Sequence, residues 1–338
     1  MQAKSGPPPE TGSQAAAETA TERRNPRTEL IDTVPTLELL RMLNEQDALV
    51  APAVASVLAE LAVVVDATVT RLEAGGSVHY FGAGSSGRIG VLDAAEVVPT
   101  FGVGPGVFVA HPAGGADAVA VAAENAEDDE ACGASAAVGL GRDDVAVGLT
   151  ASGRTPFVAG ALRAARAAGA LTVLVSSNLA APLAPLADHC LLVDTGAEAI
   201  AGSTRLKAST AQKLVLNALS TAVMVRLGRT YSNLMIGVAA TNAKLARRQV
   251  TILTQACGAS AGECRAELAR CDGDLRLALV CLLSGTSAAT ARLALSRASG
   301  IVRDALAALG SRTSGDGVLL LTYQPAASDG PAEPGATS

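Results

Sequence analysis

The sequence predicts an α/β fold in which a five-stranded parallel sheet carries helices on both faces and is followed by a small all-helical unit. Between residues 78 and 194, short apolar runs alternate with helical patterns, and this alternation is typical of a parallel sheet covered on both sides. Between residues 260 and 309, the pattern changes to short Ala- and Leu-rich helical segments separated by glycines. This change predicts a second, helical unit after the sheet.

The segment before the sheet is predicted to contain a tail and two helices. Residues 1–20 consist mainly of small and polar residues and proline, and we expect them to be disordered because they have little apolar surface to bury. Helical periodicity follows at 36–46 and at 51–73. The pair Gly75-Gly76 predicts the end of the second helix.

The alternating region supplies the strands and the helices that cover them. The predicted strands are 78–82, 107–111, 144–150, 171–177 and 189–194. The predicted helices between them are 86–97, 116–131 and 156–168, and residues 180–187 are expected to form one poor helical turn. Two long helices are predicted to follow at 203–227 and 233–257.

The C-terminal part is predicted to form three or four short helices over 260–309. The whole pattern predicts a disordered tail over 1–20, a sheet domain with N-terminal helices over 21–255, a small helical domain over 258–310 and a loose tail over 311–338. Val318 to Tyr323 is a strand-like apolar patch inside that last tail, and the pattern does not place it.

Composition excludes several function classes. The formal net charge of −6 argues against nucleic acid as a partner, because phosphate backbones need clustered Lys and Arg. We find no signal-peptide pattern and no apolar run near the ~20 residues that span a bilayer, so we expect a cytoplasmic protein without a membrane partner. The six cysteines form no C-x-x-C pair and are interpreted as buried thiols, and we expect no metal.

A glycine-rich turn, Gly82 to Arg88, is the strongest functional signal. An apolar strand leads into it and a helical stretch leads out, so backbone N–H groups at the helix start can face an anion. Ser85 and Ser86 add hydroxyl donors, and Glu96 places a carboxylate two turns further along the helix, with Asp93 as a rival. A phosphate cradle beside a carboxylate indicates acid–base chemistry on a phosphorylated small molecule.

The same turn matches G-x-G-x-x-G, which raises the alternative of a dinucleotide site. Such a site needs an acidic residue at the end of the second strand to bind the ribose. Here the second strand ends in Pro112-Ala113-Gly114-Gly115, without an acid. The sequence therefore favours a phosphate site over a dinucleotide site at this turn, and we expect no cofactor.

Two further hydroxyl-rich turns open helices. The strand over 144–150 ends in Ala151 to Pro156 (ASGRTP), and Gly202 to Arg205 (GSTR) precedes the helix over 203–227. Each turn alone is typical of an ordinary helix N-cap. Two such loops after different parallel strands, however, lie at the same end of a sheet, where α/β proteins bind ligands.

Four segments carry a resemblance to a known family. They are Gly82 to Glu96 (GAGSSGRIGVLDAAE), Glu124 to Asp128 (ENAED), Ala151 to Pro156 (ASGRTP) and Gly202 to Lys213 (GSTRLKASTAQK). Together they resemble the sugar isomerase (SIS) domain family and, within it, the N-acetylmuramic acid 6-phosphate etherases. Thr21 to Pro26 (TERRNP) and Ala240 to Gln249 (ATNAKLARRQ) fit the same group, and the resemblance runs from about residue 20 to 310.

The resemblance implies cleavage of the lactyl ether of N-acetylmuramic acid 6-phosphate to N-acetylglucosamine 6-phosphate and D-lactate. It implies a catalytic pair of Glu96 and Glu127, a homodimer, and a C-terminal unit similar to a ubiquitin-associated domain. The residues that it places at the substrate and its phosphate are Gly84, Ser85, Ser86, Ser152, Arg154, Thr155, Ser203 and Lys207.

Other interpretations stay open at this point. Glu127 lies in an acidic run, and such runs are usually solvated faces. Lys207 fits surface solvation as well as substrate binding, and the three histidines fit ordinary sheet positions. At the level of function, the alternatives are a SIS-type sugar-phosphate isomerase and a non-enzymatic regulator that senses a sugar phosphate.

Overall fold

The computed structural model describes residues 19–121, 123, 125–238, 240 and 242–310. The predicted disordered tail over 1–20 lies outside these residues except for its last two positions. The predicted loose tail over 311–338 and the apolar patch Val318 to Tyr323 also lie outside the described residues.

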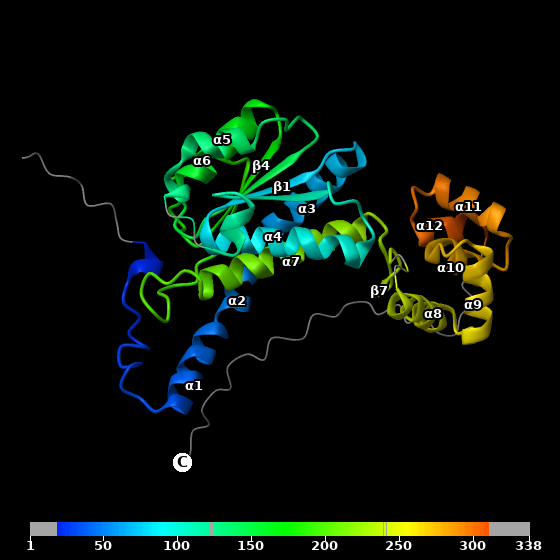
Figure 1. The fold of residues 1–338 in the computed structure, drawn as a ribbon, viewed down its shortest axis with the longest axis horizontal. Helices are drawn as coiled ribbons and strands as arrows, with labels where there is room; N and C mark the ends of the chain where they lie inside the picture. Colours follow the sequence, from blue (N-terminus) through cyan, green and yellow to red (C-terminus); the bar gives the residue numbers. More distant parts are fainter. Residues whose placement is uncertain (1–18, 122, 124, 239, 241, 311–338) are drawn as a thin grey trace, which may run out of the picture.

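A five-stranded parallel sheet forms the centre of the larger part of the molecule (Figure 1). Its strands are β1 (Val78–Gly82), β2 (Phe108–Pro112), β3 (Val145–Leu149), β4 (Leu171–Ser176) and β5 (His189–Leu192), in the spatial order β2-β1-β3-β4-β5. Every residue of β3 and β4 is buried, which is the reason for their largely apolar sequences. The predicted sheet is confirmed.

Helices cover both faces of this sheet. On one face lie α3 (Leu58–Glu73), α4 (Gly84–Phe101) and α7 (Lys207–Arg226), which share a core cluster with the strands. On the other face lie α5 (Glu130–Ala136) and α6 (Pro156–Ala167) around a second cluster. The buried apolar side chains of α7 face the core between this helix and the sheet.

The predicted helix over 116–131 is wrong. The segment instead contains two 3₁₀ turns, η2 (Ala116–Val119) and η3 (Ala126–Asp128), before α5 begins at Glu130. Asn125 adopts a left-handed backbone with φ of 61°, which no α-helix tolerates in its interior. The Asp129 side chain then accepts from the Cys132 N–H and starts α5 as an N-cap.

The predicted helix over 233–257 is only partly correct. Its first part contains β7 (Leu234–Met235), which pairs antiparallel with the preceding β6 (Thr230–Tyr231), and α8 (Ala243–Cys257) begins later. Asn242 caps α8 by accepting from the Leu245 N–H at 2.9 Å. The helices predicted over 51–73 and 203–227 also differ, because the first is split at Ser56-Val57 and the second begins at Lys207.

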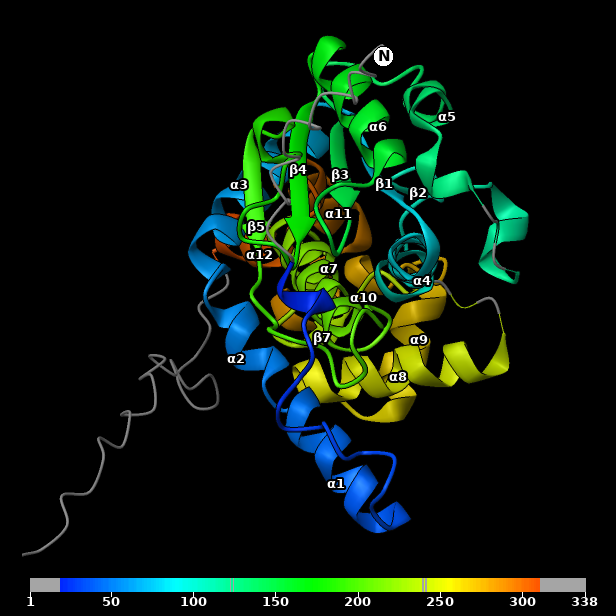
Figure 2. The same cartoon turned by 90° about the vertical axis from the view of Figure 1, so that its left-hand side faces the viewer.

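The N-terminal part of the chain lies beside the carboxyl end of the sheet. A 3₁₀ turn, η1 (Ala20–Glu22), is followed by an extended segment, then by α1 (Thr36–Asp47) and α2 (Val50–Ala55). Figure 2 shows α1 extending away from the sheet, with most of its surface uncovered.

Four short helices follow α8 at the C-terminal end. They are α9 (Ala261–Arg270), α10 (Leu275–Ser284), α11 (Ala288–Arg297) and α12 (Val302–Ala308). These helices and the buried side of α8 share a third core cluster, separate from the two at the sheet. The predicted small helical unit is confirmed, with four helices after α8 (Figure 1).

Among the residues that the structure describes, no single helix is long and apolar enough to cross a membrane. Two helix pairs are long and apolar enough only when their two helices are taken together, and each pair is sharply bent. They are Thr36–Ala55 with Leu58–Glu73, bent by 60°, and Leu275–Ser284 with Ala288–Arg297, bent by 110°.

Candidate functional site

The first predicted loop joins β1 to α4 at the carboxyl end of the sheet. Its glycines permit close packing, since a Cβ atom on Gly87 would lie 2.5 Å from the Gly82 carbonyl oxygen. Gly84 opens α4 with φ of +54°. Ser85 is half-buried and Ser86 is buried, and neither hydroxyl has a hydrogen-bond partner among the described residues. Both are therefore available to a ligand at this helix start.

The second predicted loop, between β3 and α6, is held together by hydroxyl groups. The Thr150 hydroxyl accepts from the Gly153 N–H at 3.1 Å and donates to Thr155 Oγ1 at 2.8 Å. Thr155 Oγ1 in turn donates to Glu127 Oε1 at 2.9 Å. Asn178, which follows β4, donates to the Ser152 carbonyl oxygen at 2.8 Å. The loop is therefore fixed by its own chain and by the neighbouring strand.

Glu127 lies on η3 and reaches this second loop through Thr155. Because Thr155 is buried and bonded to both Thr150 and Glu127, it fixes the orientation of the carboxylate. The Glu127 side chain is otherwise exposed, and its second oxygen has no partner among the described residues. An oriented carboxylate with one open oxygen can accept a proton from a bound molecule.

Glu96 is exposed on α4, and its carboxylate makes no hydrogen bond or ion pair to a described residue. The rival carboxylate Asp93 is buried, and it accepts from Tyr80 at 2.8 Å and from Ser220 at 2.9 Å. Burial raises the pKa of Asp93 above its ordinary value. Asp93 is thus a structural link between β1, α4 and α7, whereas Glu96 is open to solvent.

Lys207 and Ser203 lie near the start of α7. Neither side chain forms a hydrogen bond with a described residue of the β1–α4 or β3–α6 loop. Lys207 is only 2% exposed, and its ammonium group donates to Gln46 Oε1 at 3.2 Å. Burial lowers the pKa of Lys207. The carboxylate of Glu198 accepts from the Lys207 and Ala208 N–H groups and so caps α7. Ser203 is half-buried, and its hydroxyl has no partner among the described residues.

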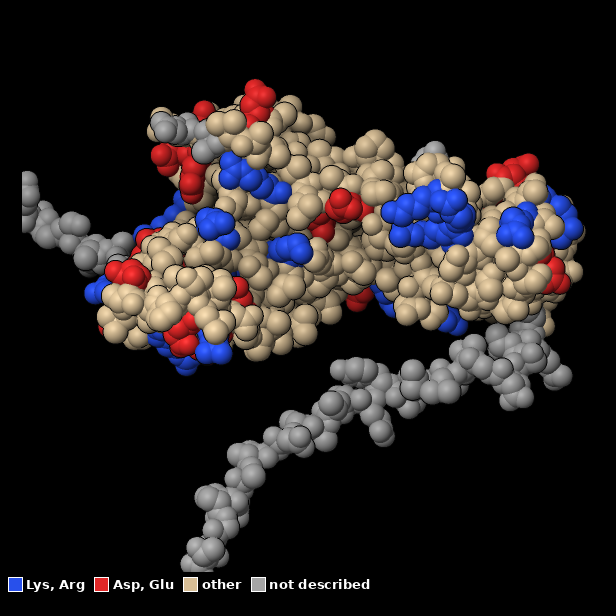
Figure 3. Space-filling view, turned by 60° about the horizontal axis from the view of Figure 1, so that its bottom comes forward, with Lys and Arg blue, Asp and Glu red and all other residues tan. Residues whose placement is uncertain are grey.

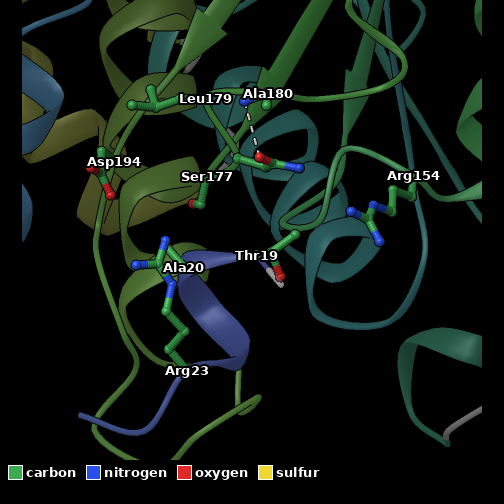
Figure 4. A pocket seen from close by; sticks show the side chains of 9 residues that line it. Thr19, Ala20, Arg23, Arg154, Ser177, Leu179, Ala180 and Asp194 are labelled. Carbon is green, nitrogen blue, oxygen red and sulfur yellow. Dashed lines mark hydrogen bonds between the residues drawn. The ribbon is translucent and has the colours of Figure 1, made fainter. Parts of the chain in front are cut away.

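A cavity of about 390 Å³ opens at the carboxyl end of β3, β4 and β5 (Figure 4). Its lining residues come from the N-terminal turn, the β3–α6 loop and the ends of β4 and β5. They are Thr19, Ala20, Arg23, Arg154, Ser177, Asn178, Leu179, Ala180 and Asp194. Arg154 is the one residue of the predicted site that lines this cavity, and Arg23, Ser177 and Asp194 were not predicted from the sequence.

The three histidines lie on sheet strands, as expected, but two of them are in contact across neighbouring strands. His79 Nδ1 and His111 Nε2 lie 2.9 Å apart, and Ser77 bridges His79 Nε2 to Asp144. Burial, together with neighbouring His79, lowers the pKa of His111 to about 4. Their separation of 32 residues hides this contact in the sequence, and the β1–β2 pairing creates it.

One group of potential metal ligands occurs in the described part of the chain, in the C-terminal helices. Glu267, Cys271 and Cys281 are buried with their ligand atoms within 4.8 Å of one another. Arg270 already pairs with Glu267, and burial raises the pKa of Cys271 to about 12, which favours the neutral thiol. The group does not include any of the predicted site residues.

Comparison with known proteins identifies the domain type. A profile of the SIS domain matches residues 123–222, and a profile of the glucokinase regulatory protein N-terminal SIS domain matches residues 60–166. Among solved structures, a phosphoheptose isomerase from Francisella tularensis overlaps with a TM-score of 0.42 at 17% identity, over 57% of this chain and 100% of that chain.

Similar sequences cover most of the chain. An N-acetylmuramic acid 6-phosphate etherase of Thermobifida fusca is 58% identical over 264 residues, which are 78% of this chain and 87% of that protein. Proteins of the same name from Rubrobacter xylanophilus and Vibrio cholerae are 50% and 46% identical, over 89% and 88% of their lengths. With identity this high over nearly the full relatives, the chain belongs to the N-acetylmuramic acid 6-phosphate etherase family.

Proposed function

We propose that this protein cleaves the lactyl ether of N-acetylmuramic acid 6-phosphate, by elimination and water addition, to N-acetylglucosamine 6-phosphate and D-lactate. The observation that carries the proposal is the 58% identity to the Thermobifida fusca etherase over 264 residues. The role fits the catabolism or recycling of cell-wall amino sugars. No observation favours the isomerase or the regulator over this reaction.

The chemistry needs one base, one acid and water. The proton on C2 is acidic only when C1 is a free aldehyde, so the sugar reacts in its open form. A base removes this proton, an acid protonates the departing lactate oxygen, and water then adds to the unsaturated intermediate. Two carboxylates can carry all of these proton transfers.

We assign the base to Glu127 and the acid to Glu96. The assignment of Glu127 is supported by the hydrogen bond from Thr155, which orients one carboxylate oxygen and leaves the other open. Glu96 is exposed on α4, about three turns after the serine-rich start of that helix. Its carboxylate is therefore available to a substrate whose phosphate lies at this helix start.

The phosphate fits the two loops at the carboxyl end of the sheet. Ser85 and Ser86 offer hydroxyls without partners, and the start of α4 offers backbone N–H groups. Ser152, Arg154 and Thr155 lie on the neighbouring β3–α6 loop. Gly84 and Ser203 remain proposed substrate contacts, whereas the inward position of Lys207 supports an indirect role through Gln46.

We also propose that the enzyme is a homodimer in the cytoplasm. The apolar face of α7 packs into the core of its own chain and is not available for pairing. Large apolar side chains are instead exposed on the N-terminal helices, for example Leu37 at 61% and Leu40 at 55%. All six cysteines are free thiols, which fits a reducing compartment.

The decisive experiment measures D-lactate release from N-acetylmuramic acid 6-phosphate. We expect release by the wild type and a loss of about 10²–10⁴ in rate for Glu127→Gln, because a positioned base contributes about that much. Asp128→Asn is the matched control, since this exposed neighbour has no bond to Thr155. A wild type that isomerises sugar phosphates without releasing lactate would contradict the proposal.

A further inference from the structure

We propose that the cavity beside η1 binds the lactyl carboxylate of the substrate and that Arg23 is the residue that recognises it. The inference rests on the proposed function and deepens it, because it separates recognition of the second anion from recognition of the phosphate. It assigns a role in substrate choice to the N-terminal segment, which precedes the SIS domain in the chain.

Arg23 is an unpaired cation at this cavity. It lines the cavity, and its guanidinium makes no hydrogen bond or ion pair with a described residue. Figure 4 shows Arg23 rising from the N-terminal turn on one side, with Arg154 on the opposite side. A planar guanidinium matches a carboxylate with two parallel hydrogen bonds, so a free one at a cavity favours this class of ligand.

A network of buried polar side chains fixes the segment that carries Arg23. Asn25 donates to Gln46 Oε1 at 2.7 Å and to the Ala197 carbonyl oxygen at 3.0 Å. Thr28 donates to the Ala199 carbonyl oxygen at 2.8 Å. These contacts join the N-terminal segment to the loop after β5, so Arg23 is held at the cavity rather than on a free tail.

Ser177 supplies a second polar group to the same cavity. It is only 3% exposed, and its hydroxyl has no partner among the described residues. Figure 4 shows this hydroxyl directed into the cavity. The residue as a whole is nearly buried, but its Oγ is not among the fully buried atoms that lack a partner. The hydroxyl therefore keeps access to the cavity and can donate a hydrogen bond to a bound acceptor.

The charges of the lining also favour an anion. Arg23 and Arg154 line the cavity together with one acid, Asp194. One oxygen of Asp194 accepts from the Gly196 N–H at 2.9 Å, and no ion pair joins Asp194 to Arg23. Of these three charged groups, Arg23 is the cation whose guanidinium has no partner among the described residues, which suits a single carboxylate.

The cavity adjoins the proposed base through one loop. Arg154 lines the cavity, and the next residue, Thr155, holds Glu127. In the substrate, the lactyl group is attached at C3, next to the carbon that loses its proton, whereas the phosphate is at the far end on C6. A carboxylate in this cavity would therefore keep C2 on the side of the loop where Glu127 lies.

The test compares two ligands that differ by the lactyl group. N-acetylmuramic acid 6-phosphate and N-acetylglucosamine 6-phosphate are titrated by calorimetry into Glu127→Gln protein, which prevents turnover. In the Glu127→Gln background, Arg23→Ala should raise the dissociation constant of the first ligand about 10- to 100-fold. This is the change expected when a hydrogen bond to a charged group is lost. Binding of the second ligand, which lacks the carboxylate, should stay unchanged.

Arg24→Ala is the matched control, because this neighbouring arginine is exposed and does not line the cavity. Equal weakening of both ligands would assign Arg23 to the phosphate or the sugar and overturn the proposal. Unchanged binding of both would also overturn it. If Arg23→Ala alters the thermal unfolding midpoint, Arg23→Gln keeps most of the side-chain length and repeats the test.

The two proposals can fail separately. If the wild type releases lactate and Arg23→Ala keeps its preference for the lactyl ligand, the carboxylate site is wrong and the etherase function stands. If the wild type releases no lactate and Arg23→Ala loses the preference, the site stands as a binding site and the proposed reaction is wrong.

Discussion

Thr155 and Glu127 show how much a single side-chain contact decides in this protein. In the sequence, Glu127 is one acid within an acidic run, which is typical of a solvated face. In the structure, the hydrogen bond from Thr155 at 2.9 Å joins it to a loop at the carboxyl end of the sheet. The other acids that the structure describes in this run, Asp128 to Glu130, have no such contact.

The first prediction at this scale separates the two proposed catalytic residues. If Glu127 removes the C2 proton, Glu127→Gln should abolish both lactate release and exchange of that proton with solvent. If Glu96 protonates the leaving oxygen, Glu96→Gln should block release but permit some exchange, because the aldehyde-stabilised carbanion forms before the ether bond breaks. NMR of the C2 proton in D₂O measures both, and the reverse pattern would exchange the roles.

A second residue-scale prediction concerns the phosphate. Ser86→Ala should raise KM for the phosphorylated substrate by about tenfold or more, because it removes a donor to a charged group. Ser135→Ala on the exposed side of α5 serves as the control. Steady-state kinetics check the prediction, and equal turnover of unphosphorylated N-acetylmuramic acid would contradict the proposed cradle.

At the scale of elements, Asp93 joins three parts of the fold. It lies on α4 and accepts hydroxyl hydrogen bonds from Tyr80 on β1 and Ser220 on α7. Burial is the largest influence on the Asp93 carboxyl group, and it raises the pKa of Asp93 in the folded protein above the ordinary value of 3.8. The folded state therefore binds this proton more tightly than the unfolded chain does.

The raised pKa of Asp93 makes the stability of the folded protein depend on pH. As pH rises from about 4 through the raised pKa, the wild type should lose part of its free energy of unfolding. Asp93→Asn cannot titrate, so its stability relative to the wild type should increase with pH and then level off. Urea unfolding at several pH values measures this, with exposed Asp117→Asn as control. A difference that stays constant with pH would contradict the prediction.

The element predicted over 116–131 shows where local pattern fails. Its composition favours a helix, yet the chain instead forms two 3₁₀ turns and a short helix. The left-handed Asn125 and the approach of Gly133 to the backbone of Phe157 on α6 explain the difference. A Cβ atom on Gly133 would lie 1.9 Å from the Phe157 carbonyl oxygen, so tertiary packing sets the position of α5.

At the scale of the whole molecule, α1 extends away from the sheet (Figure 2), and most of its residues are exposed. Figure 3 shows charged residues distributed over the sheet part and the helical part, with wide areas that carry neither sign. Exposed leucines three residues apart, Leu37 and Leu40, lie on neighbouring positions of the α1 surface. Such a surface is typical of a subunit interface.

The prediction at this scale is that α1 contributes to a dimer. The wild type should have the mass of two chains in light scattering, and the double change Leu37→Glu and Leu40→Glu should shift it toward the monomer, since charges would be buried at the interface. Arg41→Ala, on the same exposed helix, is the control. A fully active monomeric wild type would contradict this prediction.

The sequence by itself determined the parallel sheet, the covering helices other than the one predicted over 116–131, the glycine and hydroxyl turns and the family. These features depend on local periodicity and on short motifs, which act over a few residues. The division into domains at 255–258 and the catalytic roles remain predictions. The sequence also pointed to Glu127 only through resemblance, since its own neighbourhood favoured a solvated acid.

Only the tertiary structure decided which of these side chains meet. Asn25 contacts Ala197 across 172 positions, and that contact places Arg23 at the cavity. Lys207 has the sequence context of a substrate residue, but packing turns its ammonium group toward Gln46, 161 positions away. Contacts at such separations depend on how whole elements pack together, and local sequence patterns carry no information about them.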